Sequence, residues 1–242
     1  MVAKVCEKYK ELLSPFSIPY KSMFYIPSYN MLYCRIEKCG TTSWVYGTFQ
    51  QLAPQLGIDK YANQTRDEKY SNFGIKSSRA FRDILTRNPS AIAHVRHPFE
   101  RIASAYLDKV AVNVTRRIIW KGMTFPQFVN VVLTEGREKQ DLTFPKVNVH
   151  WKPMHGHCFF CSINYTVISK METYSEDKAR FLKMVGIKED IREERMNIFG
   201  GQSIQDKTRN LFKEIHKKDV EALRKMYKYD FELFEFNPDM YG

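Results

Sequence analysis

Two short runs of β-favouring or apolar residues are each followed by a polar turn and then by apolar residues at helical spacing. The first run spans residues 31–37, and a polar loop at 38–42 follows it. A helix is expected from about Ser43 onward, with Trp44, Val45 and Phe49 as its apolar face. A strand, a polar loop and a helix in this order form the opening unit of an α/β nucleotide-binding fold.

The second run, residues 91–95, is short and apolar, and Arg96 follows it directly. Pro98 suits the first turn of a helix, and helical spacing of apolar residues continues through Tyr106. Ligands of open α/β sheets bind beyond the carboxyl ends of the strands. The two junctions therefore predict an α/β fold, with a P-loop-like parallel sheet flanked by helices in a single domain.

Weaker periodic signals predict the remaining elements. They are a helix over residues 124–135, a strand over 165–169, a helix from about Ser175 that buries Ala179, Leu182 and Val185, and helices from about Ser203 and about Lys218. The tail at 230–236 alternates polar and aromatic residues, which predicts that one side of it packs on the core.

Composition supports a folded domain and adds a strong positive charge. With 242 residues, 43% of them hydrophobic, the chain can bury one sizeable core. The 38 Lys and Arg residues exceed the 27 Asp and Glu residues, which gives a net charge of +11. Such a surplus attracts polyanions, including nucleic acid, anionic membranes, acidic glycans and nucleotide phosphates, and charge alone does not choose among them.

Neither a membrane span nor a signal segment is visible. No run reaches the roughly 18 apolar residues that a spanning helix needs, and residues 1–10 carry charges throughout. A chain with no missing targeting segment would therefore stay in the cytoplasm. The five cysteines are an odd number, so at least one is unpaired within the chain. Glycosylation sequons at Asn63, Asn113 and Asn164 matter only in a secretory compartment.

The loop after the first strand has the composition of a phosphate cradle. Residues 36–43 read Ile-Glu-Lys-Cys-Gly-Thr-Thr-Ser. The N-terminus of the following helix supplies oriented N–H groups and partial positive charge, and Gly40 lets the backbone approach a ligand closely. Lys38 can place a point charge on the transferring group. The candidate cofactor-binding residues are Lys38, Cys39, Gly40, Thr41, Thr42 and Ser43.

The same segment also fits an ordinary turn between a strand and a helix, with a glycine and a capping hydroxyl. It does not have the spacing of a Walker A loop, because Lys38 precedes Gly40 instead of following a second glycine.

The turn after the second strand offers a receptor for a terminal phosphate. Arg96 sits at the strand end, and Ser104 lies two helical turns later, on the face that can look back toward it. An Arg fork and a hydroxyl together suit a phosphate, and Arg101 is a further positive group nearby. Each residue alone fits a surface helix equally well. We expect His97 to orient this turn and His94 to be a satisfied core residue of the strand.

Together the two motifs resemble the sulfotransferases that use 3′-phosphoadenosine 5′-phosphosulfate (PAPS). The second motif is most similar to the Golgi carbohydrate sulfotransferases of the chondroitin, dermatan and HNK-1 types. The matching segments are Lys-x-Gly-Thr-Thr-Ser from Lys38, Arg-x-Pro-x-x-Arg-x-x-Ser-Ala-Tyr from Arg96, His150-Trp151-x-Pro153, Cys158-x-x-Cys161, Tyr165, Glu172, and the ending with Tyr227, Asp230-Phe231 and Leu233-Phe234. They cover most of residues 30–236. The family often places Asp after the tyrosine that matches Tyr165, whereas Thr166 follows here.

The resemblance implies a role for each motif and a place for the protein. Residues 38–43 would hold the 5′-phosphosulfate of PAPS, and Arg96 with Ser104 would hold the 3′-phosphate. A sulfotransferase domain would span 29–242 after an N-terminal extension at 1–28, in the Golgi lumen. The acceptor would be a glycan hydroxyl, and the basic surface suits an anionic glycan such as chondroitin. We expect no nucleic-acid partner, and the oligomeric state stays open.

Sulfuryl transfer requires in-line attack of a hydroxyl on sulfur, so catalysis rests on positioning and charge stabilisation. We expect Lys38 to stabilise charge on the bridging oxygen of the leaving phosphate. Among the six histidines, His150 is our choice for the general base because the resemblance places it in a family motif. Glu172 is a second candidate. A structural role for His150, packed against Trp151, is an equal alternative.

The reaction needs no metal, and none is expected. The segment His155-x-His157-Cys158-x-x-Cys161 has four potential zinc ligands, but their spacing is tight, and a disulfide or reduced core thiols are the simpler interpretation. A nucleotide-dependent kinase is an alternative, against which stand the missing Walker loop and the missing acidic strand end near Lys38. A non-catalytic polyanion-binding module is disfavoured because the lysines are scattered. Lys38 and Arg96 argue against a degenerate enzyme that binds only the product nucleotide, PAP.

Overall fold

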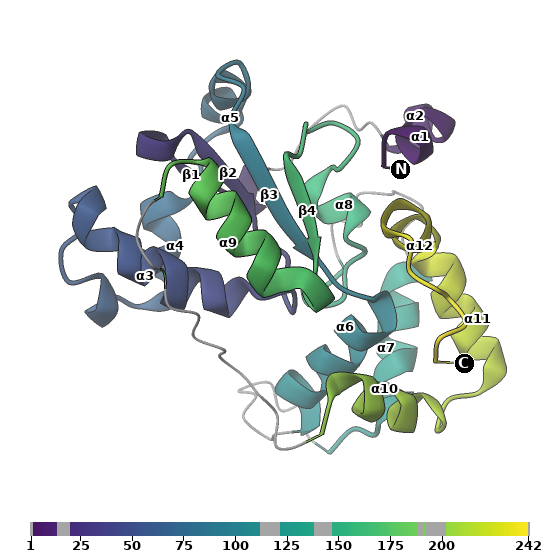
Figure 1. The fold of residues 1–242 in the computed structure, drawn as a ribbon. Helices are drawn as coiled ribbons and strands as arrows, with labels where there is room; N and C mark the ends of the chain where they lie inside the picture. Colours follow the sequence, from purple (N-terminus) through teal and green to yellow (C-terminus); the bar gives the residue numbers. More distant parts are fainter. Residues whose placement is uncertain are drawn as a thin grey trace. The chain divides into compact units, whose positions relative to one another are not determined.

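Four short strands form one sheet in the computed structural model, which describes residues 2–13, 20–111, 122–137, 147–187, 191 and 202–241. Within these ranges the strands lie side by side in the order β1 (Met23–Ile26), β2 (Met31–Cys34), β3 (Ser90–Val95) and β4 (Val167–Lys170) (Figure 1). β1 runs antiparallel to β2, whereas β2, β3 and β4 are parallel. The expected α/β class, with a mostly parallel sheet flanked by helices, is confirmed.

The parallel pairing of β2 with β3 brings the carboxyl ends of both strands to the same edge of the sheet. Cys34, the last residue of β2, lies opposite Ala93, and β3 ends shortly afterwards at Val95. The predicted strand at 31–37 stops at Cys34 because residues 37–40 form a turn. The polar loop after β2 and the turn that begins at Arg96 therefore start from the ends of neighbouring strands.

The chain divides into two compact units. The sheet unit consists of Pro15–Val95 and Cys158–Ile198, and the helical unit consists of Met1–Ser14, Arg96–His157 and Phe199–Gly242.

Aromatic and aliphatic side chains fill the core of the sheet unit. Phe24, Tyr33 and Ile92 lie in one row across β1, β2 and β3, and they belong to one buried cluster with Trp44 and Phe181 from the flanking helices. The helical elements of this unit are η1 (Tyr20–Ser22), η2 (Pro27–Tyr29), η3 (Ser43–Thr48), α3 (Phe49–Leu52), η4 (Ala53–Leu56), η5 (Tyr61–Asn63), α4 (Arg66–Phe73), α5 (Ser78–Leu85), η8 (Met171–Thr173) and α9 (Tyr174–Met184).

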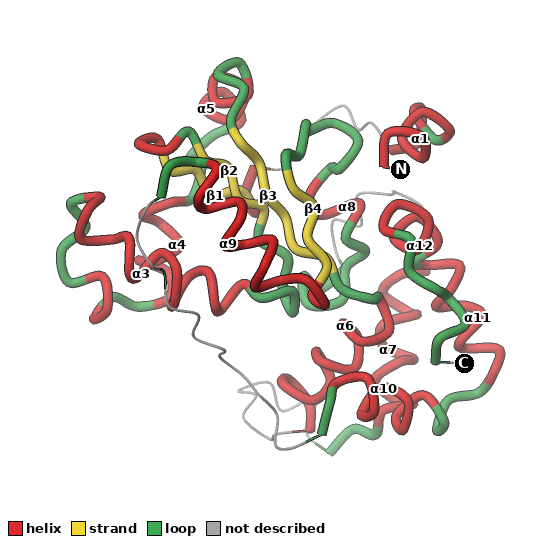
Figure 2. Tube along the Cα trace, in the orientation of Figure 1, coloured by secondary structure: helices red, strands yellow, loops and turns green. Residues whose placement is uncertain are grey.

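Helices make up the secondary structure described in the helical unit (Figure 2). Its core contains a stacked pair of rings, Phe99 and Phe212, with centroids 4.6 Å apart, and an edge-to-face pair, Phe128 and Trp151, at 5.1 Å. The helices are α1 (Val2–Lys8), α2 (Lys10–Leu13), α6 (Pro98–Tyr106), η6 (Leu107–Ala111), α7 (Phe125–Arg137), α10 (Ile204–Phe212), α11 (Lys217–Met226) and α12 (Lys228–Phe234), and α8 (His155–Cys158) ends on the first residue of the following sheet-unit segment.

Sequence periodicity located most helices but misplaced the buried face of α9. The helix begins at Tyr174, one residue before the predicted start, and it buries Tyr174, Lys178, Phe181 and Leu182. The prediction that Ala179 is buried was therefore wrong, since Ala179 lies on the exposed side. The tail at 230–236 does pack one side on the core, but as helix α12 for most of its length.

None of the helices in the described ranges combines the length and the apolar character that crossing a bilayer requires.

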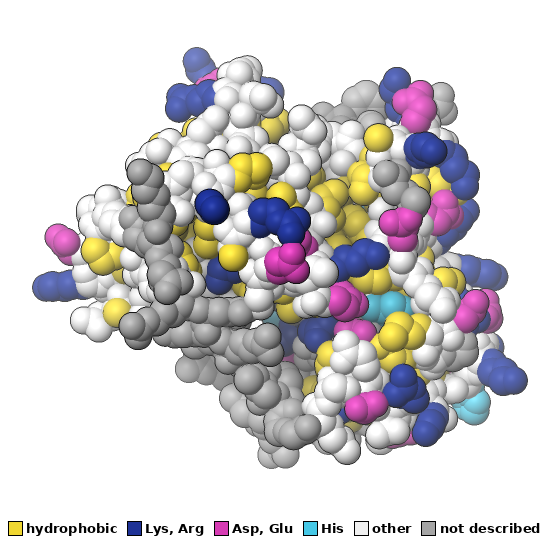
Figure 3. All heavy atoms as spheres, viewed as in Figure 1, with side chains coloured by type: hydrophobic (Ala, Val, Ile, Leu, Met, Phe, Trp, Pro, Cys, Tyr) yellow, Lys and Arg dark blue, Asp and Glu magenta, His cyan; other side chains and the backbone are white. Residues whose placement is uncertain are grey.

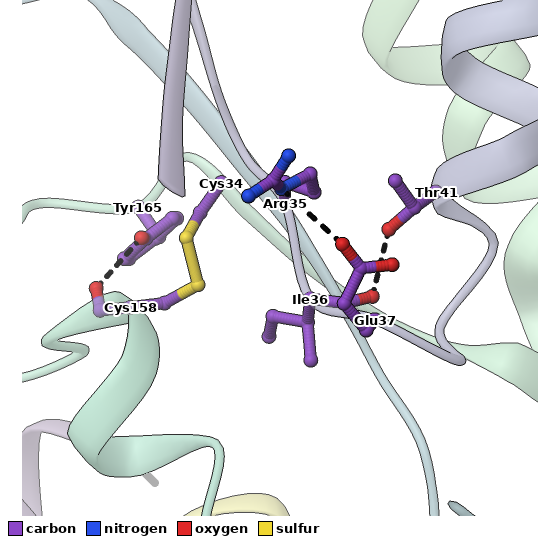
Figure 4. The surroundings of a disulfide bond; sticks show 7 residues. All are labelled: Cys34, Arg35, Ile36, Glu37, Thr41, Cys158 and Tyr165. Carbon is purple, nitrogen blue, oxygen red and sulfur yellow. Dashed lines mark hydrogen bonds and ion pairs between the residues drawn. A yellow bond between two sulfur atoms is a disulfide. The ribbon is translucent and has the colours of Figure 1, made fainter. Parts of the chain in front are cut away.

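A disulfide joins Cys34 at the end of β2 to Cys158, across 124 residues of sequence (Figure 4). Cys6 and Cys161 are in disulfide form as well, and Cys39 is a free, buried cysteine. The odd cysteine count had required at least one such unpaired residue. Near the cross-link, the Tyr165 hydroxyl donates a hydrogen bond to the Cys158 carbonyl at 2.8 Å.

His94 is an integral part of the sheet unit's core, as its position in an apolar strand predicts. Its exposed fraction is 1%, and its Nε2 accepts a hydrogen bond from the indole N–H of Trp44 at 2.6 Å. The Tyr174 ring lies 4.4 Å from the imidazole. Burial, and then the positive charge of Lys178, lower the pKa of His94 from 6.5 to about 3. The imidazole is therefore neutral near pH 7.

Replacing both Cys34 and Cys158 with Ala should lower the free energy of unfolding by about 2–5 kcal/mol, because the cross-link restricts the unfolded chain over a long loop. Urea titration measures the difference. Cys39→Ala is the matched control, since it removes a buried thiol and no cross-link and should cost about 1 kcal/mol. A double variant as stable as Cys39→Ala would contradict this expectation.

His94 should make the protein less stable in mild acid. Its folded pKa lies below the unfolded value, so the unfolded chain binds a proton that the folded chain excludes, and stability falls as the pH drops from about 6.5 toward 3. His94→Gln keeps an acceptor for Trp44 without a titrating group. Between pH 7 and pH 5 the wild type should lose on the order of 1–2 kcal/mol more than His94→Gln in urea titrations. Equal losses in both proteins would refute the buried, neutral imidazole.

Candidate active site

The loop between β2 and η3 folds tightly onto one carbonyl group. The Ile36 carbonyl accepts a hydrogen bond from the Cys39 N–H at 3.1 Å. It also accepts one from the Thr41 hydroxyl at 2.8 Å (Figure 4). Lys38 has a φ of 70°, in the left-handed region that side chains other than glycine rarely adopt. The loop thus holds Lys38 in a strained backbone conformation, as ligand-binding segments often do.

Gly40 is the one loop position where a side chain has no room. Its φ is 81°, and a Cβ atom there would lie 2.5 Å from the ring of Tyr174, the first residue of α9. The backbone of the loop therefore rests directly on an aromatic ring, and the glycine is required by both its conformation and this close approach.

Arginine side chains neutralise the carboxylate that precedes Lys38. Glu37 is buried and pairs with Arg35 and Arg66, each at 3.5 Å. Both guanidinium groups also lie against the Tyr70 ring, at 4.4 and 5.0 Å from its centroid. A negative charge next to the predicted phosphate cradle is thereby compensated within the sheet unit.

The six loop residues among the predicted cofactor-binding residues differ in how far their side chains are exposed. Lys38, Thr42 and Ser43 are partly exposed, whereas Cys39 and Thr41 are buried. Any contact that Cys39 or Thr41 makes with a ligand would therefore use the backbone. The following helical run starts at residue 41 and is π-helical over η3, a local geometry that is common at functional sites.

The second predicted phosphate site lies on α6 and on the residue that precedes His97. Arg96 follows the last residue of β3, and its Nε donates to Glu100 at 3.3 Å. Ser104 lies four residues after Glu100, on the same face of α6, and is buried. The Tyr241 hydroxyl donates to the other oxygen of Glu100 at 2.5 Å.

His97 fixes the start of α6, which supports its expected role in orienting the Arg96 turn. It is the N-cap residue, and its Nδ1 accepts a hydrogen bond from the Phe99 N–H at 3.2 Å. Its Nε2 lies 3.0 Å from the Asn237 carbonyl oxygen, which can only accept. The proton of the neutral ring therefore resides on Nε2.

Arg101, which the sequence offers as a further positive group for a phosphate, is buried in the helical unit. Only 1% of it is exposed, and its guanidinium donates to the carbonyl groups of Val149 and Lys152, at 2.8 and 2.5 Å. These two residues flank His150, which is half-buried in the turn that they form. Arg101 therefore contacts the segment that carries the proposed base.

Glu172, the second candidate base, lies on η8 between β4 and α9 and is exposed. It belongs to the sheet unit together with residues 38–43, whereas Arg96, Ser104 and His150 belong to the helical unit. Sequence reasoning missed the residues that hold these groups in place. They are Tyr174 under the loop, Arg35 and Arg66 at Glu37, and Glu135 beside residues 147–152, the turn that carries His150. Tyr227, which the sequence places in a family motif, also contacts this turn.

The potential zinc ligands are engaged in other bonds. Cys158 and Cys161 are in disulfide form, so neither is a thiolate. The Nδ1 of His155 lies 2.8 Å from Asp230, which is fully buried and also accepts from the backbone N–H groups of Met154 and His155. Among the residues that the structure describes, no three His, Cys, Asp or Glu side chains are grouped so that they could hold a metal ion.

Basic side chains are distributed over the surface that Figure 3 draws, with Asp and Glu interspersed among them. The net charge of +11 is therefore not gathered into one large patch on that face.

Comparison with known proteins identifies the family. The profile of the sulfotransferase family matches residues 21–237, a continuous match that includes parts of both units. Carbohydrate sulfotransferase 10 of Gallus gallus is 26% identical over 243 residues, which cover 90% of this chain and 67% of the relative. Carbohydrate sulfotransferase 11 of Danio rerio is 23% identical over 280 residues, with coverage of 99% and 75%. No solved structure gave a significant match. The chain belongs to the sulfotransferase family.

Proposed function

We propose that this protein transfers the sulfuryl group of PAPS to a hydroxyl of a glycan. The family supplies the donor, since sulfotransferases use PAPS. The parallel pairing of β2 with β3 carries the proposal, because it starts the Lys38 loop and the Arg96 turn at the ends of adjacent strands. Ligands of open α/β sheets bind at this edge.

Residues 38–43 bind the 5′-phosphosulfate in this proposal. The helix start after the loop presents N–H groups to an anion, and Gly40 lets the loop pack closely against the Tyr174 ring. The partly exposed Thr42 and Ser43 add hydroxyl donors. Lys38 places its ammonium on the bridging oxygen, where negative charge grows as the sulfur–oxygen bond breaks.

Arg96 and Ser104 bind the 3′-phosphate. Arg96 is paired with Glu100, which aligns its guanidinium along the face of α6 that also carries Ser104. A guanidinium presents paired donors to phosphate oxygens, and a serine hydroxyl adds one more. His97 supports this arrangement by capping the helix.

His150 takes the proton of the acceptor hydroxyl as that oxygen attacks sulfur. The sulfur–oxygen bond to the acceptor forms, the bond to the bridging phosphate oxygen breaks, and PAP leaves with the electron pair. No metal enters these steps, because Lys38 and the loop N–H groups carry the charge stabilisation.

The acceptor class and location follow from the relatives and the chemistry of the chain. The relatives are named carbohydrate sulfotransferases, and a net charge of +11 suits an anionic glycan such as chondroitin. The disulfides fit an oxidising compartment, and we propose the Golgi lumen. The catalytic domain spans residues 29–242 in this proposal, after an extension at 1–28.

Lys38→Ala should lower the turnover number by about a hundredfold or more, because it removes the charge at the leaving oxygen. The measurement is transfer of radiolabelled sulfate from PAPS to a panel of desulfated glycans, with PAP affinity from calorimetry. Lys183→Ala, at an exposed position of α9, is the control and should retain full turnover. Undiminished turnover in Lys38→Ala would show that the loop has been assigned the wrong role.

His150→Gln should abolish the acid limb of the pH–rate profile, because a histidine base is lost by protonation below about pH 6.5. Glu172→Gln should leave that limb in place. Rates at saturating PAPS across pH 5–9 for the two variants and the wild type make the comparison. If Glu172→Gln flattens the profile and His150→Gln does not, the base is Glu172.

A further inference from the structure

The turn that carries His150 is tied to the helical unit on both sides of that residue. We call residues 147–152 the His150 turn. Within it, the N–H groups of Trp151 and Lys152 both donate to the Asn148 carbonyl, at 3.0 and 2.8 Å. The side-chain oxygen of Asn148 accepts the His150 N–H at 3.0 Å. Hydrogen bonds within the turn therefore hold the backbone around the proposed base in one conformation.

Arg101 of α6 forms hydrogen bonds to this turn. One guanidinium nitrogen donates to the carbonyl of Val149, immediately before His150, and the other to the carbonyl of Lys152, two residues after it. A planar guanidinium holds two acceptors in a fixed relation, which an ammonium cannot do. The two contacts therefore fix both the place of the turn and its orientation relative to α6.

Glu135 of α7 and Tyr227 hold the same turn from other elements. One carboxylate oxygen of Glu135 accepts from the Asn148 N–H at 3.0 Å and from the Trp151 indole N–H at 2.8 Å. The Tyr227 hydroxyl donates to the Trp151 carbonyl at 2.5 Å. Trp151 itself is fully buried, edge-on to Phe128.

These contacts share one property, which is that they lie on both sides of His150. They end on residues 148, 149, 151 and 152, on either side of His150, and thereby fix the backbone from which its ring projects. Two of the three partners are a guanidinium and a carboxylate, whose charged hydrogen bonds are stronger and more directional than neutral ones, and the third is the Tyr227 hydroxyl. Preorganised groups of this kind are what a general base needs to stay within reach of one hydroxyl.

We propose that Arg101 is a positioning residue for the transfer step, acting through His150 and not through the nucleotide. The inference rests on the proposed function, in which His150 is the base. It also assigns two tasks to one helix, since α6 carries Ser104 of the proposed 3′-phosphate site and the side chain that orients the base.

A double-mutant cycle between Arg101 and His150 tests the proposal. Arg101→Lys keeps the charge but loses the two-pronged geometry, and it should lower turnover at saturating PAPS and acceptor by about tenfold, as a small displacement of a catalytic group does. The affinity for PAP should change by less than about threefold. In the His150→Gln background, Arg101→Lys should have no further effect, because the group that it positions is gone.

Two additional variants keep the test decisive. If Arg101→Lys fails to fold, Tyr227→Phe takes its place, because it removes another contact to the same turn and should show the same dependence on His150. Arg209→Lys, on the exposed face of α10, is the control and should leave turnover and PAP affinity unchanged. Thermal melts of every variant separate loss of fold from loss of positioning.

Each adverse outcome identifies what failed. No sulfate transfer by the wild type on any glycan would overturn the proposed function. Full turnover in His150→Gln would remove the base assignment and the inference with it. An impaired His150→Gln in which Arg101→Lys still costs tenfold would overturn the inference alone. Weaker PAP binding with normal turnover in Arg101→Lys would instead make Arg101 a phosphate ligand.

Discussion

Hydrogen bonding between β2 and β3 as parallel neighbours is the constraint on which the proposed chemistry depends. Side chains alternate along a strand, so a slip of one residue would move every side chain to the other face. The observed register puts Tyr33 and Ile92 in one row within the aromatic core, and it puts Cys34 on the opposite face, where it meets Cys158. Core packing and cross-link therefore specify the same register.

The Lys38 loop shows how local strain is offset by its surroundings. A left-handed backbone at a residue other than glycine costs of order 1 kcal/mol or more. Against this stand the two hydrogen bonds to the Ile36 carbonyl, the paired carboxylate of Glu37 and the contact of Gly40 with Tyr174. The loop is held in shape by contacts within the sheet unit itself.

Sequence patterns predicted the elements whose signals are local. The strand at 91–95, the helix after Pro98 and the helix from about Ser203 are read from apolar spacing and from residues at their ends. β1 was missed because a four-residue apolar run before Pro27 cannot be told from a loop by periodicity. Its role as an edge strand appears only once β2 lies beside it.

The candidate site likewise contains residues that local sequence signals identify and residues that only tertiary contacts reveal. Lys38, Gly40 and Arg96 could be singled out because a phosphate requires such residues at strand ends. Arg101 and Asp230 could not be assigned from sequence, since their partners lie about 50 and 75 residues away, at Val149 and His155. The sequence of a motif is the same whether its charged residue binds a ligand or a backbone carbonyl. Only tertiary contacts distinguish these cases.

The cross-link between Cys34 and Cys158 has a consequence for how the protein is made. During translation, Cys34 is synthesised long before Cys158, whereas Cys39 is synthesised almost immediately after Cys34. The earliest thiol that Cys34 can meet downstream is therefore the wrong one, and oxidation of a nascent chain would trap it in a small ring. In the folded loop Cys39 is buried, so its thiol no longer competes with Cys158 for Cys34. Correct pairing of Cys34 with Cys158 therefore depends on the sheet forming before oxidation is complete.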